Sequence, residues 1–270
     1  MRNATERSTR SWKPRVSPGL VRVFAAYSRR YLRQNFHALR ILKSGLPLHD
    51  PTRPLVIYLN HAAWWDPLVC LQLSREFFPR RTSYAAMDAA MLKRYGFFKW
   101  LGFFGVARNE PGAGRGFLRV TRALLASAQN AVWFTPQGRF VDVRERPLRL
   151  QNGIGALAAR HLETTFVPLA IEYSFWTEPR PEILVSFGEP IVPRACPART
   201  RSAWALEFAD ALESTQDELA ARSCLRHEAD WMTLNRGVTI AGGLRGAWRW
   251  LWAHAFGGRS AARRHPEASS

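Results

Sequence analysis

The sequence predicts an α/β fold with a mostly parallel or mixed central sheet flanked by helices, an N-terminal amphipathic helix and a helical C-terminal tail. Its 270 residues are 47% hydrophobic, which is enough for a sizeable buried core. Short continuous apolar runs, such as Leu55 to Leu59, are typical of buried strands. These runs alternate with longer amphipathic segments, and that alternation favours a sheet covered by helices.

The chain divides into four parts. Residues 1–17 are polar, basic and Pro-containing, so we expect disorder there. Residues 18–45 are predicted to form one amphipathic helix at a membrane interface, because Leu20, Phe24 and other apolar residues alternate with arginines. A surface helix packed on its own domain is the alternative. Residues 46–225 form the α/β domain, and residues 226–270 form a Trp/Arg-rich tail whose Trp248 and Trp252 share a helical face.

Within the α/β domain the expected elements follow in order. Strands are expected at 54–59, 84–87, 103–107, 131–135, 165–173 and 182–187. Helices are expected after Asp66-Pro67, over 88–100, from a Gly-rich turn at 112–116 to 129, and over 152–161 and 201–222. The Gly-rich turn lacks the Gly-Lys-Ser/Thr of a P-loop, so it gives little support for nucleotide binding.

The net charge of +18 predicts an anionic partner. Residues 1–50 carry +9 and residues 226–270 carry +4, so the excess lies at the two ends. The middle shows no zinc finger and no RNA-binding signature, so a membrane surface is favoured over nucleic acid. Three cysteines without a CxxC spacing indicate a reducing compartment. We expect no transmembrane helix and no secretory signal, and the histidine spacing predicts no metal site.

The motif most suited to chemistry directly follows the strand at 54–59. His61 and Asp66 have the spacing H-x4-D, and a strand-to-helix turn can fold this spacing back on itself. Asp66 would then orient His61 and stabilise its protonated ring, which makes His61 a general base. Two other interpretations are open at this point. Asp66 before Pro67 is also an ordinary helix cap, and His61 is also compatible with a structural histidine.

Four blocks in order make the chain resemble the glycerolipid acyltransferases typified by 1-acylglycerol-3-phosphate O-acyltransferase. They are Asn60-His61-x4-Asp66-Pro67, Gly102 to Arg108, Phe134-Thr-Pro-Gln137-Gly138-Arg139, and Val167-Pro168 to Ile171. The resemblance covers about half of the chain, from Leu55 to Pro193. It implies that residues 46–225 are an acyltransferase domain.

The resemblance also implies a mechanism and its site residues. His61, held by Asp66, would activate an acceptor hydroxyl that attacks acyl-CoA or an acyl-carrier-protein thioester, without a metal, a cofactor or an acyl-enzyme. Arg108, Gln137, Gly138, Arg139 and Pro168 lie in the blocks that would bind substrate. Arginine suits the phosphate of a lysophospholipid, and glycine permits close backbone approach.

The third block departs from the usual Phe-Pro-Glu-Gly-Thr-Arg, because Gln137 replaces the acid and Arg139 directly follows Gly138. Either Arg139 acts from a shifted position or Phe140 occupies the usual arginine's place. A glycolipid or another acceptor without phosphate therefore fits as well as a lysophospholipid. Glu172, near a strand end, is open to interpretation as a site group or as an exposed strand end.

We therefore expect an O-acyltransferase associated with the cytoplasmic face of a membrane, peripheral or monotopic, whose partners are membrane lipids and an acyl thioester. A protein that binds anionic membranes without catalysis explains the charge but not the four blocks. A degenerate acyltransferase that only binds lipid is compatible with the altered third block, but His61 and Asp66 are both present.

Overall fold

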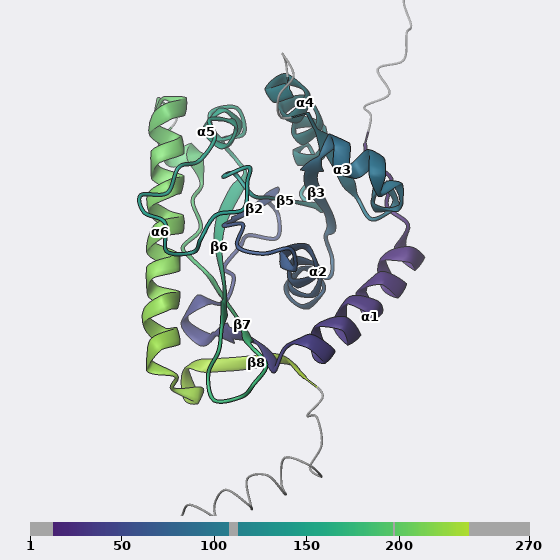
Figure 1. Ribbon diagram of the computed structural model, residues 1–270. Helices are drawn as coiled ribbons and strands as arrows, with labels where there is room; N and C mark the ends of the chain where they lie inside the picture. Colours follow the sequence, from purple (N-terminus) through teal and green to yellow (C-terminus); the bar gives the residue numbers. More distant parts are fainter. Residues whose placement is uncertain (1–12, 108–112, 197, 238–270) are drawn as a thin grey trace, which may run out of the picture.

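The structure is a computed structural model that describes residues 13–107, 113–196 and 198–237. Its centre is a sheet with the strand order β4-β3-β5-β2-β6-β7-β1-β8 (Figure 1). The strands are β1 (Ala38–Leu42), β2 (Leu55–Leu59), β3 (Thr82–Asp88), β4 (Phe103–Val106), β5 (Asn130–Phe134), β6 (Thr165–Ser174), β7 (Glu182–Phe187) and β8 (Trp231–Arg236). The helices are α1 (Pro18–Asn35), α2 (Asp66–Phe77), α3 (Ala89–Arg94), α4 (Ala113–Leu125), α5 (Gly153–Ala158) and α6 (Arg201–Leu225). Short 3₁₀ helices are η1 (Lys43–Gly45), η2 (Gly96–Trp100), η3 (Pro193–Ala195) and η4 (Glu228–Asp230).

The sheet has a parallel part and an antiparallel part. Strands β4, β3, β5, β2 and β6 are parallel, so their carboxyl ends meet at one edge. Strand β7 is antiparallel to β6, β1 is parallel to β7, and β8 is antiparallel to β1. Parallel sheets need cover on both faces. This mixed sheet flanked by helices confirms the predicted fold class.

Alternate residues of β2 belong to two different cores. Leu55 and Ile57 pack in the core that α1 and α2 cover, whereas Val56 and Tyr58 pack in the core that α4, α5 and α6 cover. All five residues of β2 are buried, because a central strand with helices on both faces has no solvent-facing side. The two layers lie on opposite sides of the sheet (Figure 1).

The expected helix over 18–45 is wrong beyond Asn35. Phe36 leaves the helix with extended backbone angles (φ −121°, ψ 153°), and Ala38–Leu42 forms β1. Arg40, which suggested a solvent-facing helical position, is only 4% exposed because its Nε lies 3.2 Å from Glu182 Oε2 on β7. The partner is 142 residues away, so local periodicity does not reveal it.

Both ends of the α/β domain extend further than the sequence suggests. Val16 forms a β-bridge with Leu101, and the amide of Ser17 donates to the carbonyl of Trp100 (2.8 Å), so these residues are not a disordered segment. At the other end β8 pairs with β1 and belongs to the sheet, not to a separate tail. The predicted disorder of 1–12 and the predicted helical tail over 238–270 lie outside the described residues.

Within 13–107, 113–196 and 198–237, no helix combines the length and the apolar composition needed to cross a bilayer.

Candidate active site

Asn60 fixes the chain where β2 ends. Its side-chain amide donates to the carbonyl of Ile171 (2.9 Å) and accepts from the amide of the same residue (2.8 Å), and Asn60 is 2% exposed. This double hydrogen bond joins the end of β2 to β6. The next residue, His61, therefore starts from a rigid position at the carboxyl edge of the parallel strands.

His61 and Asp66 form the hydrogen-bonded pair that their spacing predicts. Nδ1 of His61 lies 2.7 Å from Oδ2 of Asp66, and the amide of Ala63 donates to the same oxygen (3.1 Å). Asp66 is the first residue of α2, and Trp65 holds the N-cap position. The carboxylate therefore folds back toward His61 instead of capping the helix, in a position where the helix dipole favours negative charge.

Tyr173 is a third member of this site that sequence reasoning missed. Its hydroxyl donates to Oδ1 of Asp66 (2.7 Å). Burial and the neighbouring Asp66 raise the pKa of Tyr173 well above its usual value, so the hydroxyl keeps its proton and remains a donor. In the sequence, only the alternation of residues along β6 indicates where this side chain lies, because Ile171 and Tyr173 share a face of the strand.

These contacts determine which nitrogen of His61 is free. An ionised carboxylate only accepts hydrogen bonds, so Nδ1 must carry the proton of the neutral ring. Nε2 is then the basic nitrogen, and it forms no hydrogen bond with any residue that the structure describes. Asp66 is 1% exposed, whereas the side chain of His61 is 17% exposed, so part of the imidazole reaches the surface and its partner does not.

The loop over residues 135–151 holds the backbone of His61. The side-chain carbonyl of Gln137 accepts from the amide of His61 (3.0 Å), and the amide of Val141 donates to its carbonyl (2.9 Å). The ring of Phe140 lies 4.1 Å from the imidazole, centroid to centroid. Gln137 thus holds the backbone of His61, a role that the expected substrate contact did not include.

Gly138 is required by the turn of this loop. Its φ is +72°, a region that side-chain-bearing residues rarely adopt. A Cβ added here would lie 2.2 Å from the amide nitrogen of the Gln151 side chain. Arg139 points away from the pair, since its guanidinium binds Glu145 (2.9 Å) and its side chain is 64% exposed.

Two more predicted substrate contacts lie elsewhere. Pro168 is in the buried middle of β6, opposite Tyr58 of β2. Arg108 lies outside the described residues. The structure therefore brings together His61, Asp66 and Gln137, but it does not place Arg139 or Pro168 with them.

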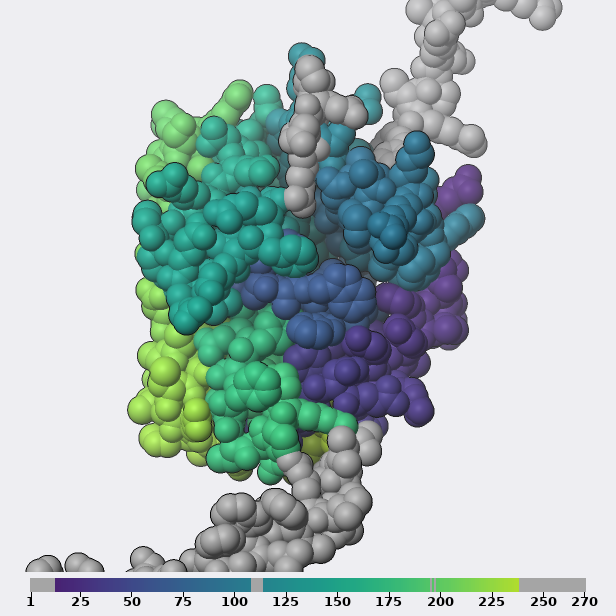
Figure 2. Space-filling model, in the orientation of Figure 1, coloured from purple at the N-terminus to yellow at the C-terminus, as the bar shows by residue number. Residues whose placement is uncertain are grey.

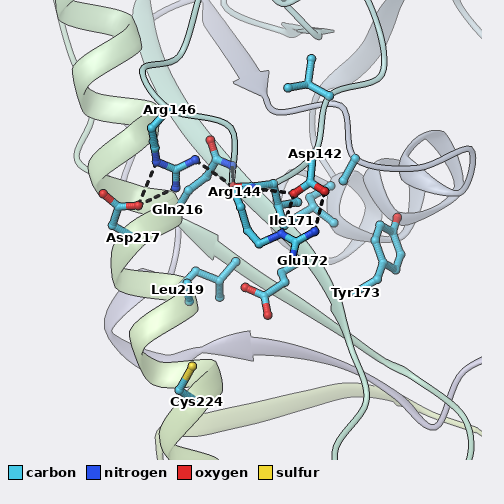
Figure 3. A pocket seen from close by; sticks show the side chains of 14 residues that line it. Asp142, Arg144, Arg146, Ile171, Glu172, Tyr173, Gln216, Asp217, Leu219 and Cys224 are labelled. Carbon is cyan, nitrogen blue, oxygen red and sulfur yellow. Dashed lines mark hydrogen bonds and ion pairs between the residues drawn. The ribbon is translucent and has the colours of Figure 1, made fainter.

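A cavity of about 700 Å³ lies beside His61 and Asp66, between the end of β6, the loop and α6 (Figure 3). Its lining includes Ala62, Val141 and Tyr173, each adjacent to or bonded with the pair. In the described parts of the chain, no cluster of three His, Cys, Asp or Glu side chains is arranged to hold a metal ion.

Comparison with known proteins identifies a family for this chain. The model of the Acyltransferase family matches residues 33–172, which is 140 of the 270 residues. The matched stretch runs from the end of α1 into β6 and includes His61, Asp66 and Gln137. No match is found among curated proteins. Because the family model covers more than half of the chain, the chain belongs to the Acyltransferase family and is an acyltransferase.

Proposed function

We propose that this acyltransferase moves a fatty acyl group from an acyl thioester, carried by coenzyme A or acyl carrier protein, to a hydroxyl of a lysophospholipid or related lipid. The observation that carries the proposal is the 2.7 Å contact between His61 Nδ1 and the buried Asp66, which leaves Nε2 basic. The family supplies the reaction class, and this geometry supplies the base.

The proposed reaction needs one proton shuttle. Nε2 of His61 takes the proton of the acceptor hydroxyl while its oxygen attacks the thioester carbonyl carbon. The tetrahedral adduct then collapses, the C–S bond breaks, and the thiolate takes the proton from the imidazolium. Asp66 stabilises the imidazolium between the two transfers, because charge attraction in a buried site is strong. An ester and a free thiol are the products.

Cys70 on α2 is a candidate for a competing covalent route. It packs against the core beside the catalytic segment. Burial raises the pKa of its thiol well above the usual value, and the charge of Asp66 adds to this effect. A protonated thiol is a poor nucleophile, so direct attack by the lipid hydroxyl is the favoured route.

A line of aromatic rings supports the proposal that the enzyme works at a membrane surface. Rings of Trp64, Tyr31, Tyr27, Phe24 and Phe97 follow one another at centroid distances of 6.5, 6.0, 5.8 and 5.4 Å. We call these five residues the aromatic face. It runs from the catalytic segment along α1 to η2, and these segments adjoin on one side of the molecule (Figure 2).

Several members of the aromatic face are exposed. The exposed fractions are 64% for Trp64, 55% for Tyr27 and 42% for Phe97, and neighbouring Val23 is 69% exposed. The elements that carry these rings also carry exposed cations, which are Arg22, Arg29 and Arg30 on α1 and Lys99 on η2, and Lys93 and Arg94 of α3 lie nearby in the sequence. Aromatic residues next to cations suit the headgroup layer of an anionic membrane.

An acyl-transfer screen tests the reaction. Purified protein receives a labelled acyl-CoA or acyl carrier protein together with lysophosphatidate, a lysophospholipid or a monoglycosyl monoacylglycerol, and mass spectrometry identifies the product. We expect a new ester with at least one acceptor and none with His61→Ala. Equal ester formation by His61→Ala would contradict the role of His61.

Vesicle sedimentation tests the membrane surface with a matched pair of variants. Val23→Glu places a charge beside the aromatic face, and Leu206→Glu places the same charge on α6, where Leu206 is 66% exposed. We expect Val23→Glu to weaken binding to anionic vesicles and Leu206→Glu to bind as the wild type does. Equal binding by both variants would contradict docking through α1.

A further inference from the structure

We propose that the cavity beside His61 and Asp66 binds the polar head group of the acyl acceptor, and that this head group is an uncharged sugar rather than a phosphate monoester. This inference rests on the proposed function, because it assigns an acceptor class to the same site. Its basis is the position of the cavity, its charge and the hydrogen-bond acceptor that it leaves without a donor.

The cavity is placed to hold one end of an acceptor whose hydroxyl reaches His61. Ala62 directly follows His61, the amide of Val141 donates to the carbonyl of His61, and Tyr173 donates to Asp66. All three residues line the cavity. Its volume of about 700 Å³ is within the range of pockets that bind small molecules.

The arginines of the cavity are already neutralised. Arg144 binds both oxygens of Asp142 (2.9 and 2.8 Å). Arg146 binds Asp217 of α6 through two nitrogens (3.1 and 2.5 Å). Both pairs are visible in Figure 3.

Glu172 is the remaining charged group of the lining, so the cavity carries a formal charge of −1. A phosphate monoester carries about −1.5 to −2 near neutral pH. It would find both arginines occupied and would lie near a carboxylate of the same sign. Arg139 offers no substitute, because Glu145 already binds it.

The cavity instead presents a hydrogen-bond acceptor without a donor, on Glu172. Gln216, its neighbour in the lining, is already engaged, because its side chain donates to the carbonyl of Val143 (3.2 Å). Glu172 accepts one bond, from Ser223 (2.9 Å) to Oε1. Its other oxygen accepts none from the residues that the structure describes.

A sugar hydroxyl supplies the donor that the second oxygen of Glu172 lacks, and it brings no charge. The apolar part of the lining, which includes Val141, Ile171 and Leu219, suits the C–H faces of a sugar ring. Gln137, which replaces an acid in the third motif block, is engaged with the amide of His61. The charge pattern and the acceptor pattern therefore favour the same class of head group.

Calorimetry on His61→Ala, which holds acceptors without turnover, tests the inference. The two probes are 1-hexanoyl-3-glucosylglycerol and 1-hexanoylglycerol 3-phosphate, which share a tail and a glycerol unit. We expect the glucoside to bind at least tenfold more tightly at an ionic strength of about 0.15 M, where long-range attraction of the phosphate to the basic chain is screened. Equal or tighter binding of the phosphate would overturn the inference.

A variant of the lining locates the binding. Glu172→Gln keeps the shape and removes the charge, so the glucoside should bind about five- to tenfold more weakly and the phosphate more tightly. The melting temperature of the variant is the check of folding. Asp210→Asn, which removes an exposed carboxylate of α6 outside the cavity, should change the binding of neither probe. Unchanged binding of both probes in Glu172→Gln would contradict the assignment.

The inference and the proposed function fail in different ways. If the wild type acylates lysophosphatidate through His61 and the phosphate probe binds more tightly, the sugar assignment falls and the acyl transfer stands. If the glucoside binds in the cavity but no lipid hydroxyl is acylated, the proposed reaction falls and the binding site stands.

Discussion

Two buried carboxylates, one in each part of the sheet, have opposite surroundings. Asp66 lies at the carboxyl edge of the parallel strands and is 1% exposed, and Glu182 begins β7 in the antiparallel part and is 2% exposed. Asp66 accepts hydrogen bonds from His61, Ala63 and Tyr173. Glu182 binds the guanidinium of Arg40 (3.2 Å).

The difference separates catalysis from stability. Arg40 is always charged, so its pair with Glu182 is complete in the resting protein. The neutral partners of Asp66 leave its charge without a counter-ion until His61 takes a proton. A carboxylate in that state stabilises a charge that develops during the reaction. We therefore expect Asp66 to control rate and Glu182 to control folding.

The largest effect is expected from Asp66→Asn. The variant removes the charge that stabilises the imidazolium, so kcat should fall by about two to four orders of magnitude. No unpaired charge is left behind, so the free energy of unfolding should fall less than in Glu182→Gln. Steady-state kinetics and denaturant titration measure the two quantities. Near-normal turnover by folded Asp66→Asn would contradict the expectation that Asp66 controls the rate.

Glu182→Gln should show the reverse pattern. Arg40 would be left buried and unpaired, which costs about 3–5 kcal/mol of unfolding free energy. The folded fraction should keep its kcat. Glu163→Gln is the matched control, because it breaks the solvent-exposed pair with Arg53 (3.1 Å) and should cost about 0–1 kcal/mol. Equal costs for the two variants would show that burial of the pair does not matter.

Tyr173→Phe should have a smaller effect on catalysis. Losing the hydrogen bond to Asp66 frees the carboxylate to rotate, and such a bond contributes about 1.5 kcal/mol, or roughly tenfold. We expect kcat to fall by about that factor with KM unchanged, because the carboxylate that faces His61 has lost a donor. An unchanged kcat in the folded variant would indicate that Tyr173 acts only through packing.

The smallest effect concerns stability at the opposite edge of the parallel strands, where His161 lies just before β6. Burial, and then the charges of Arg122 and Arg160, lower the pKa of His161 below its usual value of 6.5. The neutral form is favoured in the folded state, so this contribution is complete above pH 6.5 and is lost as pH falls through the lowered pKa. His161→Asn should lose less stability than the wild type between pH 7 and pH 5. An identical pH dependence would exclude this histidine as the cause.

The parallel strands and β7 were predictable from local sequence, whereas β1 and β8 were not. Strands β2, β5 and β6 have continuous apolar runs, and the motif follows β2 directly, so local sequence suffices. Strand β1 contains Arg40, whose burial depends on Glu182 far along the chain. Leu39 and Leu42 also have helical spacing, so the apolar pattern wrongly predicted that the helix continues through residues 38–42.

Within the site, the sequence indicated the pair but not what surrounds it. The spacing of His61 and Asp66 is local, and a strand-to-helix turn brings the two together. Tyr173 is 107 residues from Asp66, and only the pairing of β2 with β6 places it there. Gln137 was expected to touch substrate, but its oxygen holds the amide of His61. Such roles depend on tertiary contacts that periodicity does not encode.

A double-variant cycle tests most directly whether His61 and Asp66 act as one unit. Single-turnover acyl transfer is measured for His61→Ala, Asp66→Asn and the double variant, with the wild type as reference. Residues that act as a unit are not additive, so the double variant should be no slower than His61→Ala. A double variant whose loss equals the product of the two single losses would show that Asp66 does not act through His61.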